Sequence, residues 1–157
     1  MVPLKNFDQT ARAFNLGYEN PENTVIDGAF LQFASGHPFL YFAMRNFVSD
    51  FKDEWANQGP KLLTTVWNQY KNLQLRNKQF PTVTVASNTV FYPIPWTLAM
   101  EMFQSHSNFT VTEIVETSVS LHLWNALTRT AKVESGSIME QLARKMCPGY
   151  ALDFSVF

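Results

Sequence analysis

The chain enters its second predicted helix through the stretch Trp55-Ala56-Asn57-Gln58-Gly59-Pro60, which is followed by an amphipathic run. Pro60 suits the first turn of a helix, because the N–H group that proline lacks would have no partner there. Asn57 and Gln58 therefore lie at a helix N-terminus, where side-chain amides are able to bind a polar ligand. A helix cap without a ligand is the alternative that this local chemistry leaves open.

Strands and helices are expected to alternate on both sides of this stretch. Apolar residues predict a buried strand at 24–33, interrupted at Gly28, where the glycine marks either a bulge or close approach of the backbone to a ligand. The pattern as a whole favours an α/β architecture. Helical spacing predicts helices at 40–51, 59–70, 96–103 and 138–146, and shorter apolar runs predict strands at 83–85, 90–92 and 118–124.

Two features of the C-terminal third are more specific. In the last predicted strand, alternation places His122 on the face opposite Leu121 and Leu123. A hydrogen-bonded structural histidine is the alternative to a ligand-binding one at such a position. The final helix is preceded by Ser137 and Glu140 in the spacing of a capping box.

Composition limits the class of protein. The 157 residues fit one domain, predicted to span 1–157, and 15% are aromatic while 16% are charged. The net charge of −1 and the lack of a basic run argue against a nucleic-acid partner. No run is apolar enough for a membrane span, and the single cysteine, Cys147, excludes an internal disulfide.

Six motifs, in order, resemble segments of the alpha-1,4-glycosyltransferases, the family of globotriaosylceramide (alpha-1,4-galactosyl) synthase. The motifs cover nearly the whole chain and resemble the C-terminal conserved region of that family. Each motif is weak alone, and their order makes the resemblance specific. They are Val2–Asn6, Asp27–Leu31, Trp55–Thr64, Phe91–Trp96, His122–Asn125 and Cys147–Pro148.

The resemblance implies a GT-A-type α/β fold, with a mixed sheet flanked by helices. It implies a retaining enzyme that transfers a hexose, galactose or N-acetylhexosamine, from a UDP-sugar to a glycosphingolipid and forms an alpha-1,4 linkage. It further implies residence at the luminal face of the Golgi membrane, through an anchor that this chain lacks. The implied cofactor is a divalent metal, manganese above all, which suits a diphosphate partner.

Site roles follow from the resemblance position by position. His122 matches a late histidine that binds the metal and the diphosphate. Asn57 and Gln58 match the catalytic corner, where amides orient the sugars and stabilise developing positive charge. The remaining matches bind donor or acceptor: Asp27, Gly28 and Ala29 on the donor-sugar strand, Trp55 and Gly59 at the corner, and Trp96 on the acceptor side.

The sequence also departs from the family pattern. The family's Asp-x-Asp motif is absent, and Asp27 replaces an uncharged amide. We therefore expect a C-terminal part of the catalytic domain without its nucleotide-binding half, inactive alone. The alternative is a non-catalytic fragment or paralogue that binds glycolipid or a partner protein. The sequence leaves the choice of UDP-sugar open.

Overall fold

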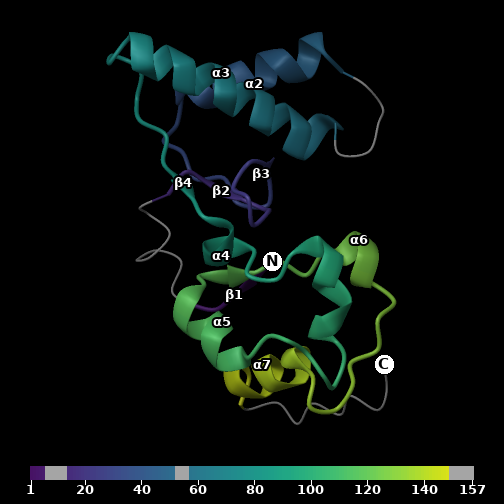
Figure 1. The fold of residues 1–157 in the computed structure, drawn as a ribbon. Helices are drawn as coiled ribbons and strands as arrows, with labels where there is room; N and C mark the ends of the chain where they lie inside the picture. The colour runs from purple at the N-terminus through teal and green to yellow at the C-terminus, as the bar shows by residue number, and fades with distance from the viewer. Residues whose placement is uncertain (6–13, 52–56, 149–157) are drawn as a thin grey trace.

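The computed structural model describes residues 1–5, 14–51 and 57–148, with the backbone alone for Asn57 and Gln58. Small sheets and short helices alternate along the chain, which confirms the α/β expectation (Figure 1). The strands are β1 (Val2–Pro3), β2 (Leu16–Tyr18), β3 (Ile26–Asp27), β4 (Val85–Ala86) and β5 (Ser120–Leu121). The helices and helical turns are α2 (Pro38–Ser49), η2 (Asn57–Lys61), α3 (Leu62–Arg76), α4 (Asn88–Phe91), η3 (Trp96–Met102), α5 (Val111–Thr117), α6 (Asn125–Thr128) and α7 (Ile138–Met146).

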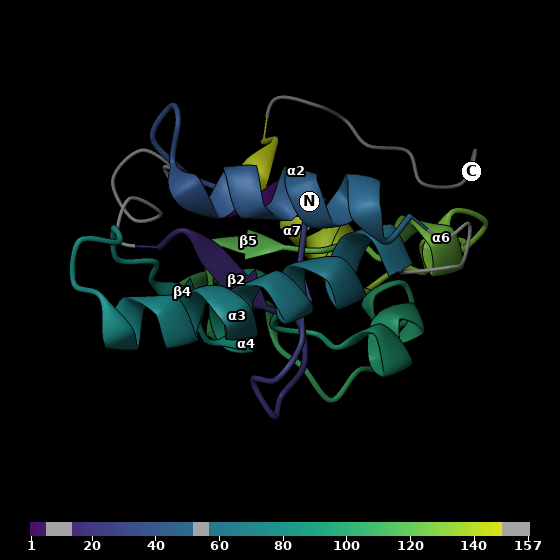
Figure 2. The same ribbon diagram turned by 90° about the horizontal axis from the view of Figure 1, so that it is seen from above.

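One half of the molecule packs the helices α2 and α3 against a three-stranded sheet. The two helices run side by side and antiparallel in both views (Figures 1 and 2). In the sheet, β2 pairs antiparallel with β3 and parallel with β4. The amphipathic character predicted for the second helix is confirmed, because Leu63, Val66, Trp67 and Tyr70 on one face are buried.

The other half is built on β1 and β5, which pair antiparallel with Val2 opposite Leu121. Its core joins that ladder to η3, α5 and α7. The predicted start of α7 is confirmed, because the Glu140 N–H donates to the Ser137 hydroxyl. The Glu140 carboxylate accepts from the Gly136 N–H, one residue before the cap. The core residues of this half are Leu4, Ile94, Ala99, Met102, Phe103, Ile114, Leu121, Ile138 and Leu142.

Phe91 joins the two halves. Its ring is fully buried and stacks on Phe30 with centroids 3.9 Å apart. The ring also lies against the backbone of Gly17, where an added Cβ would come within 2.7 Å of the Phe91 ring. Strand β2 therefore needs a glycine at this position, because of close packing.

The substitution Gly17→Ala is expected to destabilise the chain by about 1–3 kcal/mol, the usual cost of overpacking. The new methyl group would meet Phe91 and also Tyr92, whose ring lies 3.1 Å from the Cβ position. Urea denaturation followed by circular dichroism measures the change. The control is Gly36→Asn, at an open position with φ of +72° that asparagine tolerates. Equal midpoints for wild type and Gly17→Ala would contradict the packing described.

The predicted strand at 24–33 is wrong over most of its length, since β3 has two residues. The Asn20 side chain accepts hydrogen bonds from the N–H groups of Thr24 and Val25, which removes them from any ladder. Beyond β3 the chain turns at Gly28, whose N–H donates to Asp27 Oδ1 over 2.6 Å. Side chains that accept hydrogen bonds from backbone N–H groups thus limit strand β3 at both ends.

The other three strand predictions are also corrected. Residues 90–92 lie in and after helix α4, because the Tyr92 N–H donates to the carbonyl of Asn88. The strand predicted at 83–85 is shifted to Val85–Ala86. The strand predicted at 118–124 contracts to Ser120–Leu121, and the chain turns sharply after it at His122.

Helix α2 leaves part of its apolar surface exposed. Met44 and Val48 are 68% and 79% exposed, and Phe39 is the buried residue of the helix. Its partly buried residues Leu40, Phe42 and Ala43 pack against the core. With apolar residues on more than one stripe, periodicity alone does not select the buried one. No helix in the described ranges is long and apolar enough to cross a bilayer.

Candidate functional site

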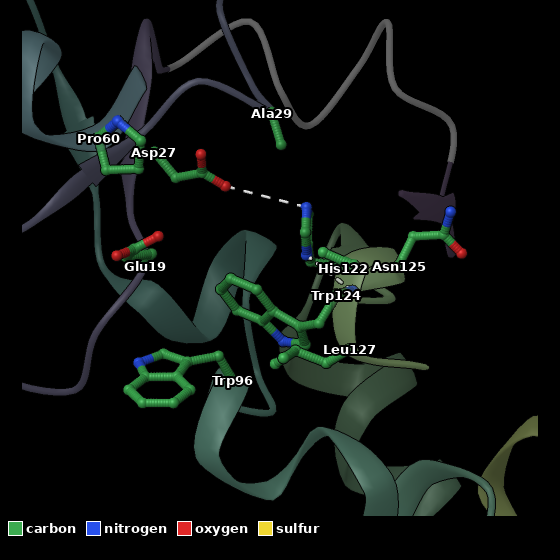
Figure 3. Close-up of a pocket in the computed structure, with 10 residues that line it drawn as sticks. Glu19, Asp27, Ala29, Pro60, Trp96, His122, Trp124, Asn125 and Leu127 are labelled. Atoms are coloured by element: carbon green, nitrogen blue, oxygen red, sulfur yellow. Dashed lines mark hydrogen bonds and ion pairs between the residues drawn. The ribbon is translucent and has the colours of Figure 1, made fainter. Parts of the chain in front are cut away.

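A pocket of about 630 Å³ opens between the end of β3 and the segment that joins β5 to α6 (Figure 3). Its volume lies within the range of small-molecule sites, roughly 300–1,000 Å³. Acidic side chains make up much of its polar part, and aromatic side chains make up much of its apolar part. The lining residues are Glu19, Asp27, Ala29, Pro60, Trp96, His122, Trp124, Asn125, Ala126 and Leu127.

Asp27 and His122 face each other across the pocket (Figure 3). His122 Nε2 lies 3.9 Å from Asp27 Oδ2, which is within ion-pair range and longer than a hydrogen bond. Both side chains are largely buried, with 21% of His122 and 15% of Asp27 exposed. The two residues are 95 positions apart in the sequence, and the strand ends of β3 and β5 bring them together.

A hydrogen bond from the backbone determines which ring nitrogen of His122 carries the proton. The Trp124 N–H donates to His122 Nδ1 over 3.1 Å. In the neutral ring, Nε2 therefore carries the proton and directs it toward the pocket. Burial lowers the pKa of His122, and the opposing effect of the Asp27 charge is smaller. The ring is consequently neutral at pH 7 and acts as a hydrogen-bond donor through Nε2.

Trp124 holds the histidine in place from an unusual backbone conformation. Its φ and ψ of 51° and 48° are left-handed, which costs a non-glycine residue roughly 1–2 kcal/mol. The indole N–H donates to the carbonyl of Ile94 over 2.8 Å, and the ring lies 4.3 Å from the ring of His122. Strain of this kind concentrates at functional sites. The motif at 122–125 thus depends on the motif at 91–96.

Glu19 adds a second carboxylate, at the residue after β2. Burial, and then the charge of Asp27, raise the pKa of Glu19 to about 7. The same two carboxylates, together with burial as the main cause, raise the pKa of the Tyr92 hydroxyl well above its ordinary value. The pocket therefore holds an ionisable group poised near neutral pH, while the phenol of Tyr92, which is fully buried, stays protonated.

The variant Glu19→Gln should make stability less dependent on pH between about 4.5 and 7. In that window the folded chain binds more protons at Glu19 than the unfolded chain, so stability falls as pH rises. Glutamine removes this penalty. For a half-buried group screened by solvent, we expect a gain on the order of 1–2 kcal/mol at pH 8 and almost none near pH 4.5.

Thermal denaturation of the variant and the wild type across pH 4.5–8 tests this prediction. Because His122 titrates in both proteins, the informative quantity is the difference between their stabilities at each pH. Glu22→Gln, at an exposed carboxylate on the same loop, is the matched control for removing a negative charge from this loop. A difference for Glu19→Gln that does not change with pH would show that the pKa of Glu19 is not raised.

The structure gathers four of the predicted site residues in the pocket: Asp27, Ala29, Trp96 and His122. Gly28 lies beside them, but its close approach is to helix α3, since an added Cβ would lie 3.2 Å from Leu63. The donor, acceptor and metal roles predicted for these residues stay predictions.

The predicted catalytic corner is described in part. Gly59 departs from helical geometry, with φ of −115° and ψ of −105°, and Pro60 after it lines the pocket. The backbone of Asn57 and Gln58 forms the start of η2, which places the corner beside β3. Their side chains and the whole of Trp55 lie outside the described part, so their roles stay predictions.

Sequence reasoning missed Glu19, Trp124 and Leu127 as parts of the site. Glu19 lies in a segment without periodicity, and nothing in its neighbours indicated a pocket. Trp124 was within a recognised motif, yet the predicted strand gave it only a place on a face. Its contact with Ile94 depends on the turn after β5, which alternation does not predict.

The residues of the pocket do not by themselves fit a metal ion. In residues 1–5, 14–51 and 57–148, no three His, Cys, Asp or Glu side chains cluster as a metal site. A histidine that binds metal through Nε2 needs a proton on Nδ1, and here Nδ1 already accepts from the Trp124 N–H. Metal ligation would require that hydrogen bond to break. No chemical step is therefore derived through a metal.

Comparisons with known proteins agree with the resemblance. A family model described as "Alpha 1,4-glycosyltransferase conserved region" matches residues 32–152. The chain is 32% identical over 129 residues to lactosylceramide 4-alpha-galactosyltransferase of Mus musculus, and 30% identical over 129 residues to that of Homo sapiens. It is 32% identical over 127 residues to alpha-1,4-N-acetylglucosaminyltransferase of Homo sapiens. No solved structure shows a significant match.

The matches cover most of this chain and a smaller part of each relative. The two galactosyltransferase alignments include 79% of the chain, and the N-acetylglucosaminyltransferase alignment includes 74%. In each case the aligned region is 36% of the relative. The pocket residues Trp96 and His122 lie inside the region that the family model matches.

Proposed function

The chain belongs to the alpha-1,4-glycosyltransferase conserved-region family, and from that premise we propose that it forms part of a glycosyltransferase centre. The proposed reaction transfers a hexose, galactose or N-acetylhexosamine, from a UDP-sugar to a glycosphingolipid, with retention. The relatives' names include an alpha-galactosyl and an alpha-N-acetylglucosaminyl transferase, and the former name lactosylceramide as acceptor. These names support a glycolipid acceptor for the present chain.

The observation that carries the proposal is the meeting of three separate motifs in one pocket. Asp27 comes from the motif at 27–31, Trp96 from the motif at 91–96, and His122 from the motif at 122–125. The motif at 2–6 supports the motif at 122–125, because strand β1 pairs with strand β5 directly before His122. Residues that the resemblance selected independently thus line a single cavity.

Each group has a chemical role that fits transfer. The Nε2–H of His122 would donate to an oxygen of the leaving diphosphate and stabilise its negative charge. Asp27 would accept hydrogen bonds from hydroxyl groups of the donor sugar. Asn57 and Gln58 at the corner would orient donor and acceptor and stabilise the oxocarbenium-like charge. Manganese, the metal implied by the family, is proposed on the family's account alone, because the described pocket residues do not by themselves fit an ion.

The same premise supports a GT-A-type domain and a position at the luminal face of the Golgi membrane, both as proposals. A second candidate function is binding of glycolipid, or of a partner protein, without transfer. It is favoured by the described pocket, in which no three His, Cys, Asp or Glu side chains cluster as a metal site. The two candidates differ in whether a product forms.

A transfer assay separates them. The 157-residue chain is assayed, together with a chimera in which its matched residues replace those of the mouse relative. Lactosylceramide is the acceptor, and UDP-galactose, UDP-N-acetylgalactosamine and UDP-N-acetylglucosamine are compared as donors. Mass spectrometry detects the product, and digestion by α- or β-specific glycosidases reports the anomer.

An α-linked product from the chimera supports the transferase proposal, and activity of the chain alone would remove the expectation that it is inactive in isolation. A β-linked product would refute retention. A folded chimera that yields no product with any of the three donors would favour glycolipid binding without transfer.

A further inference from the structure

Glu19 is a carboxylate in the pocket that no motif had selected. It is held at the end of β2 by its backbone, whose N–H donates to the carbonyl of Val25 over 2.9 Å. Its side chain is half-buried and lines the pocket on the same wall as Asp27. No described residue donates a hydrogen bond to this carboxylate. A polar group so placed is costly unless a ligand or water satisfies it.

Two tryptophans form the apolar part of the cavity next to Glu19. Figure 3 shows Trp96 on the same side of the pocket as Glu19, with Trp124 between this side and His122. Trp96 is 54% exposed, so its ring is available to a ligand. Trp124 is fixed by its hydrogen bond to Ile94. A hexose matches this combination, because it offers an apolar C–H face to an aromatic ring and hydroxyl groups to a carboxyl group.

Building on the proposed function, we propose that Glu19, Trp96 and Trp124 form the subsite for the terminal galactose of the acceptor. Glu19 would bind a hydroxyl group of that galactose, while the tryptophans contact its apolar face. The donor is assigned to the side of the pocket that contains His122, because the Nε2–H of His122 is able to donate to its diphosphate.

Binding of lactose to the unaltered 157-residue chain tests the subsite directly. Lactose is a soluble disaccharide with terminal galactose, and saturation-transfer NMR measures weak affinities without any catalysis. We expect Glu19→Ala to weaken lactose binding about tenfold or more, as for loss of a hydrogen bond to a charged group. Trp96→Ala, at an exposed position, should also weaken it. Glu22→Gln, on the same loop and outside the pocket, is the matched control and should bind as the wild type does.

A parallel titration with UDP-galactose distinguishes the two sources of galactose. If Glu19→Ala weakens binding of UDP-galactose and leaves lactose binding unchanged, Glu19 belongs to the donor side and the proposal is wrong. Failure of the unaltered chain to bind lactose would also overturn it. Circular dichroism and the melting temperature verify that each variant is folded, and removal of the half-buried carboxylate is not expected to unfold the chain.

The subsite and the proposed function fail in different ways. If lactose binding depends on Glu19 but the chimera has no transfer activity, the subsite proposal stands and the transferase proposal is refuted. Transfer by the chimera with an unchanged acceptor KM in Glu19→Ala would keep the transferase and refute the subsite.

Discussion

Replacing Phe91 by alanine is expected to destabilise the chain by about 3–5 kcal/mol, as for other fully buried aromatic residues. The Phe91 ring is fully buried, stacks on Phe30 and meets Phe14 edge to face with centroids 6.1 Å apart. Its removal leaves a cavity between the half that carries β2 and β3 and the half that carries β5. Since domains are stable by roughly 5–15 kcal/mol in total, this loss is a large fraction.

Urea denaturation measures this loss. The control is Leu75→Ala on helix α3, where the leucine side chain is 76% exposed and its truncation should change stability by about 0.5 kcal/mol or less. A Phe91→Ala cost as small as that of the control would show that the two halves do not pack on this ring. Because Phe91 precedes Tyr92 and lies against Gly17, the substitution is also expected to disturb the wall of the pocket that contains Glu19.

Replacing His122 by alanine is expected to lower the transfer rate by about 100-fold or more, the usual loss for a group that stabilises charge in the transition state. The loss should appear in kcat, because the charge on the diphosphate develops as the sugar bond breaks. Stability should change less, since His122 is partly exposed and its ring makes a hydrogen bond with one backbone N–H. His106→Ala, at an exposed position in a loop, is the matched control.

The parts of the fold that the sequence predicted are those that local chemistry determines. Helix α3 has one clear apolar stripe, and Val66 and Tyr70 on it are fully buried. The start of α7 follows from Ser137 and Glu140, whose side chains satisfy free backbone donors close by. The ordered motifs also selected Asp27 and His122, which line the pocket. Short residue patterns are able to specify a family without specifying the tertiary structure.

The parts that the sequence did not predict depend on distant partners. Strand β3 is short because the Asn20 side chain takes the donors of Thr24 and Val25, which strand periodicity does not register. Glu19 enters the site only because β2 lies between β3 and β4. On helix α2, several apolar stripes compete, and packing against α3 selected the stripe with Phe39. In each case a tertiary contact decided among local alternatives.

The measurement that most directly tests the central claim is the rate of sugar transfer to lactosylceramide by the chimera and by its His122→Ala and His106→Ala variants. If the pocket of Asp27 and His122 is the transfer site, the chimera is active, His122→Ala loses about 100-fold or more in kcat, and His106→Ala is unchanged. Equal rates for wild type and a folded His122→Ala variant would contradict the claim and place the chemistry elsewhere in the molecule.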